Sequence, residues 1–406
     1  MNSHDMNWID RLAAYRRDRV PQGRPPGRAR WRLLGAGTAI VAGAVIAAAA
    51  PAAASTAAAK PTPRPGLRGA IEQIVDDGVP GAIGLARHGG RVVAAASGAA
   101  DLATGQPMAV ADRVRAGSIT KTMVATVVLQ LAAEHRLHLS DSIARWLPGL
   151  VPGGQAITLQ ELLQHTSGIY DYVNDPGFLP AVAADPDRVW PPRALIAIAA
   201  AHPPLFPPGT KFAYSNTDYL LLGLVIEKIT GHPLGRELAD RIFAPLRMAH
   251  TTFPVSQVIP PAPYAHGYWF HLPGAPGPLD VTQTSPSIGW AAGGVVSTAG
   301  DLARFYIALL SGQLLPPRQL HQMLTTIPVP RRPGNRYGLG ILSVRTPCGT
   351  AWGHAGDFPG YYSNVFTARG GARQAIVLAN SDVNGLTTQQ NADIETAIVA
   401  GLCGHL

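Results

Sequence analysis

Short apolar runs joined by glycine pairs mark both ends of the folded part of the chain. Residues 81–98 read GAIGLARHGGRVVAAASG and predict a β-hairpin that turns at Gly89–Gly90. GYYSNVFTARGGARQAIVLAN predicts a second hairpin around Gly370–Gly371, and NADIETAIVAGL predicts a final helix after it. Because hairpin strands pair antiparallel, we expect both chain ends to build one antiparallel sheet flanked by helices.

The middle of the chain has the periodicity of helices. TLQELLQHTSG opens with a capping box from Thr158 to Glu161, NTDYLLLGLVIEKITG ends at Gly231, and TAGDLARFYIALLSG ends at Gly312. Loops rich in proline and glycine separate these helices. We therefore predict an α/β fold with an inserted, mainly helical lobe at roughly residues 131–284, and a cleft between lobes is a common place for a functional site.

One predicted helix is apolar on nearly every side. From Thr122 to Ala133 it carries no charge, which is typical of a buried helix, yet Lys121 lies in its first turn, three residues after Ser118. Burial and the positive end of the helix dipole both favour the neutral amine, and a serine nucleophile needs such a base beside it. The alternative is an ordinary lysine whose ammonium extends to water. Of the four lysines in the chain, only Lys121 follows a serine at this spacing.

Charge and composition divide the chain into three parts. The first 32 residues hold eight arginines and three aspartates and supply +5 of the formal net charge of +8, so the rest gives no reason to expect nucleic-acid binding. We interpret residues 1–59 as a basic region followed by an export signal, with a retained membrane anchor through residues 33–54 as the alternative. Residues 60–66 form a proline-rich linker, and residues 67–406 form the folded domain. We expect a secreted or cell-envelope protein.

The chain has two cysteines, Cys348 and Cys403. An even number in an exported protein favours a disulfide, and two unpaired thiols are the alternative. No group of His, Cys and Asp residues has the spacing of metal ligands, so we expect neither a metal nor another cofactor.

Two short motifs could complete a site around Ser118, because an acylated serine also needs a proton relay and an oxyanion hole. Tyr-x-Asn begins at Tyr172, Tyr214 and Tyr362; Tyr214-Ser-Asn216 is preferred because its loop runs straight into a helix, whereas Tyr362 lies in a strand pattern. His-x-Gly begins at His88, within a predicted turn, and at His354, where His354-Ala355-Gly356 could line a sheet edge.

Ser118-x-x-Lys121, Tyr214-Ser-Asn216 and His354-Ala355-Gly356 together resemble the three motifs of the penicillin-recognising serine hydrolases. Strings such as ELLQHTSGIYDYVND and SIGWAAGGVVST, with the cysteine pair, are similar to the exported D-alanyl-D-alanine carboxypeptidases of streptomycetes, relatives of class C β-lactamases. The resemblance runs from about residue 67 to the end, and the fold that it implies matches the lobes predicted above.

The resemblance also implies roles for individual residues. Ser118 would be the acylated nucleophile, Lys121 its activator and Tyr214 the proton shuttle, while His354 would line the active-site strand and help the electrostatics. The backbone N–H groups of Ser118 and Asp357 would form the oxyanion hole. The substrate would be contacted by Asn216, Trp290, Ala355 and Gly356.

Two departures from the family pattern concern the substrate. Ala355 replaces a hydroxyl residue of the third motif. Leu342 stands where the carboxypeptidases have an arginine that binds the terminal carboxylate of the substrate. Arg345 is nearby, but at this odd spacing from Leu342 its side chain should point to the other face of a regular strand. We expect foremost a D-alanyl-D-alanine carboxypeptidase that acts on small peptides, such as peptidoglycan stem peptides, with β-lactams as candidate inhibitors. The alternatives are an esterase, a β-lactamase or a D-amino-acid amidase on the same fold, and a non-catalytic sensor of wall peptides or β-lactams.

Overall fold

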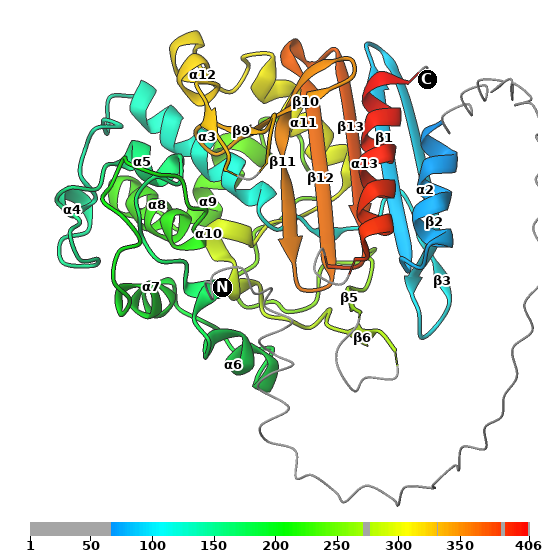
Figure 1. The fold of residues 1–406 in the computed structure, drawn as a ribbon, viewed down its shortest axis with the longest axis horizontal. Helices are drawn as coiled ribbons and strands as arrows, with labels where there is room; N and C mark the ends of the chain where they lie inside the picture. Colours follow the sequence, from blue (N-terminus) through cyan, green and yellow to red (C-terminus); the bar gives the residue numbers. More distant parts are fainter. Residues whose placement is uncertain (1–65, 271–276, 331, 383–385, 405–406) are drawn as a thin grey trace, which may run out of the picture.

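The computed structural model describes residues 66–270, 277–330, 332–382 and 386–404. Both predicted hairpins are present: β1 (Gly81–His88) pairs with β2 (Arg91–Asp101), and β12 (Tyr361–Ala368) pairs with β13 (Arg373–Ala379). Strand β1 also pairs antiparallel with β13, so the two ends of the chain meet inside one sheet (Figure 1). The predicted antiparallel sheet built from both chain ends is therefore confirmed.

Within the described residues, the sheet has nine strands in the order β3-β2-β1-β13-β12-β11-β10-β9-β8. The remaining strands are β3 (Gln106–Pro107), β8 (Ile327–Pro328), β9 (Arg336–Tyr337), β10 (Leu342–Thr346) and β11 (Gly349–Phe358). Helices α2 (Leu67–Asp76) and α13 (Thr388–Cys403) cover one face and enclose a core of their own with the strands. Helix α11 (Ala299–Leu310) packs against the opposite face, where the larger core lies.

The predicted helical lobe lies beside this sheet, on the side of β11 (Figure 1). Its α-helices are α4 (Ile143–Trp146), α5 (Leu159–Leu163), α6 (Phe178–Ala184), α7 (Pro192–Ala200), α8 (Asn216–Thr230) and α9 (Leu234–Leu238). The capping box of α5 is formed, because the Thr158 hydroxyl accepts from the N–H of Glu161 while the Glu161 carboxylate accepts from the N–H of Thr158. Helix α8 ends at Gly231 in the left-handed conformation, as predicted.

Helix α3 (Ile119–Ala133) lies between the two parts of the molecule. Twelve of its fifteen residues are buried, against α8, α10 (Trp290–Gly293), α12 (Pro317–Met323) and strand β11. The prediction of a buried helix that begins beside Ser118 is confirmed, and burial on all sides holds its first turn in place.

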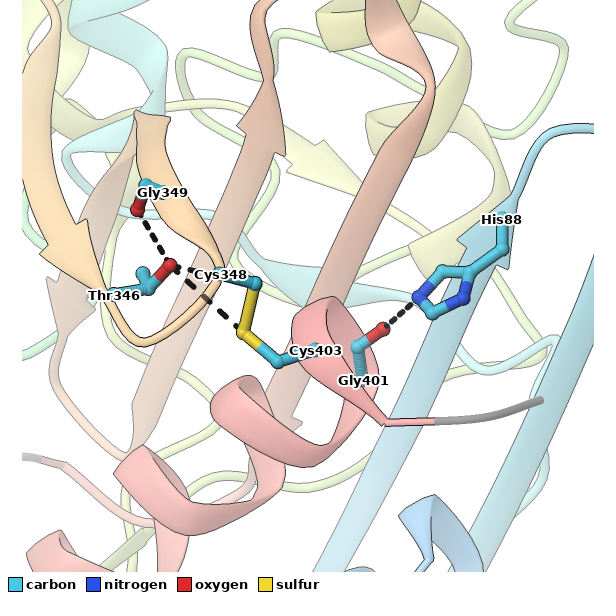
Figure 2. Close-up of a disulfide and its surroundings, with 6 residues drawn as sticks. All are labelled: His88, Thr346, Cys348, Gly349, Gly401 and Cys403. Carbon is cyan, nitrogen blue, oxygen red and sulfur yellow. Dashed lines mark hydrogen bonds between the residues drawn. A yellow bond between two sulfur atoms is a disulfide. The ribbon is translucent and has the colours of Figure 1, made fainter.

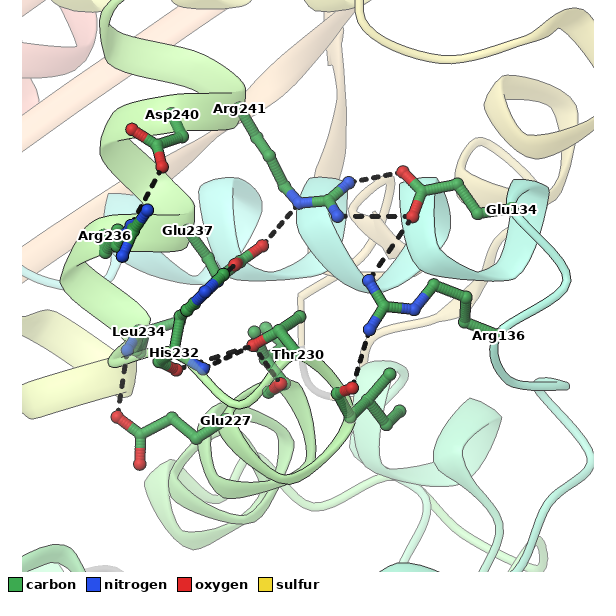
Figure 3. A network of polar contacts seen from close by, with 12 residues as sticks. Glu134, Arg136, Glu227, Thr230, His232, Leu234, Arg236, Glu237, Asp240 and Arg241 are labelled. Carbon is green, nitrogen blue, oxygen red and sulfur yellow. Dashed lines mark hydrogen bonds and ion pairs between the residues drawn. The ribbon is translucent and has the colours of Figure 1, made fainter.

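Ion pairs and a hydrogen bond connect the C-terminal end of α3 to the helical lobe (Figure 3). The Arg241 guanidinium, in the turn after α9, donates to both carboxylate oxygens of Glu134, which follows α3, and its Nε donates to Glu237 at 2.6 Å. Arg136 donates to the carbonyl of Ile229 near the end of α8 at 2.6 Å. Because these contacts are partly exposed, we expect them to contribute little to the stability of the fold. We assign them the role of orienting the end of α3 relative to the helical lobe.

The two cysteines form a disulfide (Figure 2). The bond joins Cys348, in the turn between β10 and β11, to Cys403 at the end of α13, with 5.4 Å between the Cα atoms. Beside it, Nε2 of His88 lies 2.9 Å from the carbonyl oxygen of Gly401, so His88 ties the first hairpin to the same helix. This placement agrees with a structural role for His88.

No helix in the described part of the chain is long and apolar enough to cross a membrane. The predicted export segment, residues 1–59, and all of the linker except Gly66 lie outside the described residues.

Replacing both Cys348 and Cys403 by serine should destabilise the domain. The bond closes a loop across a sequence separation of 55 residues, and the loss of that closure should lower the free energy of unfolding by roughly 4 kcal/mol on the chain-entropy model. Urea denaturation of the oxidised wild type and the double variant measures the difference, with reduced wild type as the matched control. A difference below about 1 kcal/mol would show that this bond does not constrain the unfolded chain as that model requires.

Candidate active site

A close backbone contact positions Ser118. Gly117 has φ of +55°, and a Cβ atom there would lie 2.6 Å from the carbonyl oxygen of Asp357. A Cβ atom on Gly356 would likewise overlap the carbonyl oxygen of Ala116. Two glycines thus allow strand β11 to run directly beside the turn that opens α3. Ser118 is the N-cap residue of that helix and its side chain makes no capping hydrogen bond.

Lys121 is completely buried, and its Nζ lies among three oxygen atoms. These are Oγ of Ser118 at 3.0 Å, Oδ1 of Asn216 at 2.7 Å and the carbonyl oxygen of Ala292 at 2.9 Å. Burial disfavours the ammonium and lowers the pKa of Lys121 to about 7, although the nearby Asp171 carboxylate opposes this shift. A substantial fraction of Lys121 is therefore the neutral amine at neutral pH.

The three contacts direct the lone pair of that amine. Oδ1 of Asn216 and the carbonyl oxygen of Ala292 can only accept, so each takes one N–H of the neutral amine. The Ser118 hydroxyl can donate, and the remaining lone pair of Nζ faces it. In this geometry the neutral amine of Lys121 can act as a base toward the Ser118 hydroxyl.

Tyr214 lies over Lys121, with Nζ 4.8 Å from the centre of its ring. Its hydroxyl is buried and has no hydrogen-bond partner of good geometry among the described residues. Burial raises the pKa of Tyr214 well above its usual value, while the nearby Ser118 side chain opposes the rise. Tyr214 therefore keeps its proton at neutral pH.

His354 is buried next to the site and is uncharged. Its Nδ1 lies 2.5 Å from the carbonyl oxygen of Ala355, which can only accept, and Nε2 lies 3.0 Å from the hydroxyl of Tyr337. Nδ1 therefore carries the proton and Nε2 accepts from Tyr337. Burial, with the charge of Lys121, lowers the pKa of His354 to about 3. His354 thus adds no positive charge, and whatever it contributes to the electrostatics comes from a neutral ring.

A cavity of about 220 Å³ opens in front of Ser118. Three of the predicted residues line it together with Ser118: Tyr214, Asn216 and Asp357. The other predicted residues of the three motifs are not part of its lining: Lys121, His354, Ala355 and Gly356. Sequence analysis missed several lining residues. No short motif marks Phe178, Trp269, Phe358 and Asp382, and the Tyr-x-Asn motif at Tyr172 was passed over in favour of the one at Tyr214.

Trp290, expected to contact the substrate, does not line this cavity. Its backbone has φ of +33°, and its ring lies where a Cβ atom on Gly223 of α8 would be, which buries it between the helices. The tryptophan at the cavity is Trp269, in the short strand β5 (Tyr268–Trp269). Trp269 also lines a larger neighbouring cavity of about 450 Å³.

The ionisable groups that line the cavity are acidic or phenolic. Asp357 and Asp382 contribute carboxylates, and no Lys, Arg or His is among the described residues of the lining. Leu342 packs at the edge of the core under α2 and α13, and Arg345 is exposed on the same strand. Neither residue lines the cavity, so the described part of the lining holds no arginine in place of the one that binds the terminal carboxylate in the carboxypeptidases.

Comparisons with known proteins show the family to which the chain belongs. The family described as "Beta-lactamase" matches residues 67–398. The chain belongs to the beta-lactamase family. The resemblance to this family seen in the sequence is thereby confirmed.

Relatives within the family carry several activities in their names. The "Putative penicillin-binding protein PbpX" of Bacillus subtilis (strain 168) is 29% identical over 271 residues, 66% of this chain and 61% of that protein. The "Putative D-alanyl-D-alanine carboxypeptidase" of Escherichia coli (strain K12) is 31% identical over 144 residues, 34% of this chain and 32% of that one. The chain thus spans less than two thirds of the length of these relatives.

A solved structure matches over a larger share. The D-stereospecific amidohydrolase from Streptomyces sp. is 39% identical, with a TM-score of 0.76, and the match covers 84% of this chain and 98% of that one.

Replacing Gly117 by alanine should damage both the fold and the site. The left-handed backbone alone costs a non-glycine residue roughly 1–3 kcal/mol, and the new Cβ atom would also push β11 away from Ser118. Gly89 is the matched control, because its φ is +58° and nothing lies near its Cβ position. We expect Gly117→Ala to lower the free energy of unfolding more than Gly89→Ala, measured by urea denaturation. Equal losses would contradict the close contact between Gly117 and Asp357.

Proposed function

We propose that this enzyme hydrolyses amides and esters of small D-amino-acid derivatives whose ends are uncharged or cationic. The observation that carries this proposal is the lining of the Ser118 cavity, with two carboxylates and no cationic side chain among its described residues. A free carboxylate would find no cationic side chain among the described residues of this lining, and an anion held in a cavity without a partner is costly. An amide, an ester or an ammonium group avoids this cost.

Acylation would begin with the neutral amine of Lys121. Nζ takes the proton of the Ser118 hydroxyl while Oγ forms a bond to the carbonyl carbon of the substrate. The negative charge that develops on the carbonyl oxygen is stabilised by the backbone N–H groups of Ser118 and Asp357, whose chain segments lie side by side.

Tyr214 would complete the step. When the bond from the carbonyl carbon to the leaving nitrogen or oxygen breaks, the Tyr214 hydroxyl donates its proton to the leaving group and regains one from the Lys121 ammonium. Its raised pKa favours this role, because the phenol is protonated when the leaving group needs a proton. Water then attacks the acyl-enzyme with the same groups in reverse, which releases the acid and restores Ser118.

A D-alanyl-D-alanine carboxypeptidase remains the second candidate. The motifs around Ser118, Tyr214 and His354 and the relative in Escherichia coli support it. Export, expected from residues 1–59, would place the enzyme among cell-wall peptides. The charge of the cavity weighs against it, because a carboxypeptidase must accept the free carboxylate that ends its substrate.

Matched substrates separate the two candidates. We expect kcat/KM for the C-terminal amide or methyl ester of a D-Ala-D-Ala peptide to equal or exceed that for the free acid, and D-amino-acid amides to be turned over repeatedly. Ser118→Ala is the control and should lose all turnover and any adduct with a fluorophosphonate. A preference for the free acid of about a hundredfold or more, roughly 2.7 kcal/mol, would favour the carboxypeptidase. A single adduct without turnover on any substrate would favour a sensor.

A further inference from the structure

Asn216 makes two hydrogen bonds, one on each side of its amide. Oδ1 accepts from Nζ of Lys121 at 2.7 Å, and Nδ2 donates to Oδ2 of Asp171 at 2.9 Å. The other oxygen of Asp171 accepts from the N–H of Val173 at 3.2 Å, which fixes the carboxylate at the start of a short helical turn. Asp171 is itself buried, with 6% of its surface exposed. The result is a chain of contacts from Asp171 through Asn216 to Lys121 and Ser118.

The direction of the Asn216 amide matters for the base. With Oδ1 toward Lys121, the amide takes one N–H of the neutral amine and leaves its lone pair to Ser118. With Nδ2 toward Lys121, the amide would repel the ammonium or donate to the lone pair in competition with Ser118. A charged carboxylate can only accept, so Asp171 selects the first arrangement.

We infer that Asp171 is the positioning residue of this site, which holds the amide oxygen of Asn216 toward Lys121 and so directs the base at Ser118. The inference rests on the proposed function, since it assigns Asp171 to the same acylation step. Asp171 touches neither Ser118 nor the cavity, and it acts through Asn216. A nucleophile whose base is oriented by a third group is the general logic of such sites.

The charge of Asp171 has a second effect on Lys121. Burial raises the pKa of Asp171 to about 6, against the effect of its hydrogen bonds and of Lys121, so the carboxylate is charged above that pH. A nearby negative charge favours the ammonium, so the loss of Asp171 should lower the pKa of Lys121. The other ionisable groups facing Lys121 are His165, Tyr214, Asp218, Tyr219 and His354.

Asp218 offers a matched control for Asp171. Nδ1 of His165 accepts from the N–H of Ser215 at 3.3 Å and lies 3.0 Å from Oδ2 of Asp218, so Asp218 must supply the proton between them. Its other oxygen accepts from Ser167 at 2.6 Å. Burial likewise raises the pKa of Asp218 well above its usual value. Asp218 is therefore a neutral donor, and an amide can replace it without a change in charge.

The experiment compares D171N and D218N with the wild type. The full-length proteins are labelled with a fluorophosphonate between pH 5 and 9, and the rate of the Ser118 adduct is measured by intact mass. The wild-type rate should rise with pH around a midpoint near 7. We expect D171N to lower the plateau by about tenfold or more and to move the midpoint down by up to about one pH unit. D218N should stay within about threefold of the wild type, with the same midpoint.

Each outcome decides the inference. If folded D171N has the plateau and midpoint of the wild type, or if D218N loses as much as D171N, the inference is overturned. If the wild type is not labelled at Ser118, the proposed function fails first and the inference with it. If D171N does not fold, the double variant D171N/N216D takes its place, because its amide at position 171 can donate a hydrogen bond to its carboxylate at position 216. Ser118 in this double variant should be labelled faster than in N216D alone, and equal labelling rates would overturn the inference.

Discussion

The structure depends on one buried amine. Nζ of Lys121 has no access to solvent, and its three partners come from three parts of the chain: Ser118 at the N-cap of the same helix, Asn216 at the start of α8 and the carbonyl of Ala292 in α10. An ammonium in this position is costly, so the neutral form is populated near pH 7. The packing of the fold brings these three oxygen atoms to Nζ and keeps water away from them.

Each layer of the fold contributes to that arrangement. The sheet built from both chain ends provides β11, which approaches Ser118 through Gly117 and Gly356. The helical lobe provides α8 and with it Asn216 and, just before it, Tyr214. Helix α3 is apolar on all sides because it is packed between these parts, and its burial is also what lowers the pKa of Lys121. The chemistry of the site is thus a direct consequence of the packing.

Sequence reasoning succeeded where the signal is local. The hairpins at Gly89–Gly90 and Gly370–Gly371, the capping box of α5 and the Ser118–Lys121 spacing are all set by neighbouring residues. Features that depend on the tertiary fold were out of reach. Asp171 contacts Asn216 across 45 positions of sequence, and Trp269 rather than Trp290 lines the cavity, because the Trp290 ring packs against Gly223 of α8. The neutral state of His354 follows from burial, which its motif does not reveal.

The protonation state of Lys121 is the most direct test of this account. The chain has only four lysines, so lysine-selective ¹³C labelling gives at most four signals, and the one missing in Lys121→Met belongs to Lys121. An NMR titration of that signal should give a pKa of about 7, compared with 10.5 for an ordinary lysine. A pKa near 10 would mean that Lys121 is an ammonium at neutral pH. Lys121 could then not be the base directed at Ser118.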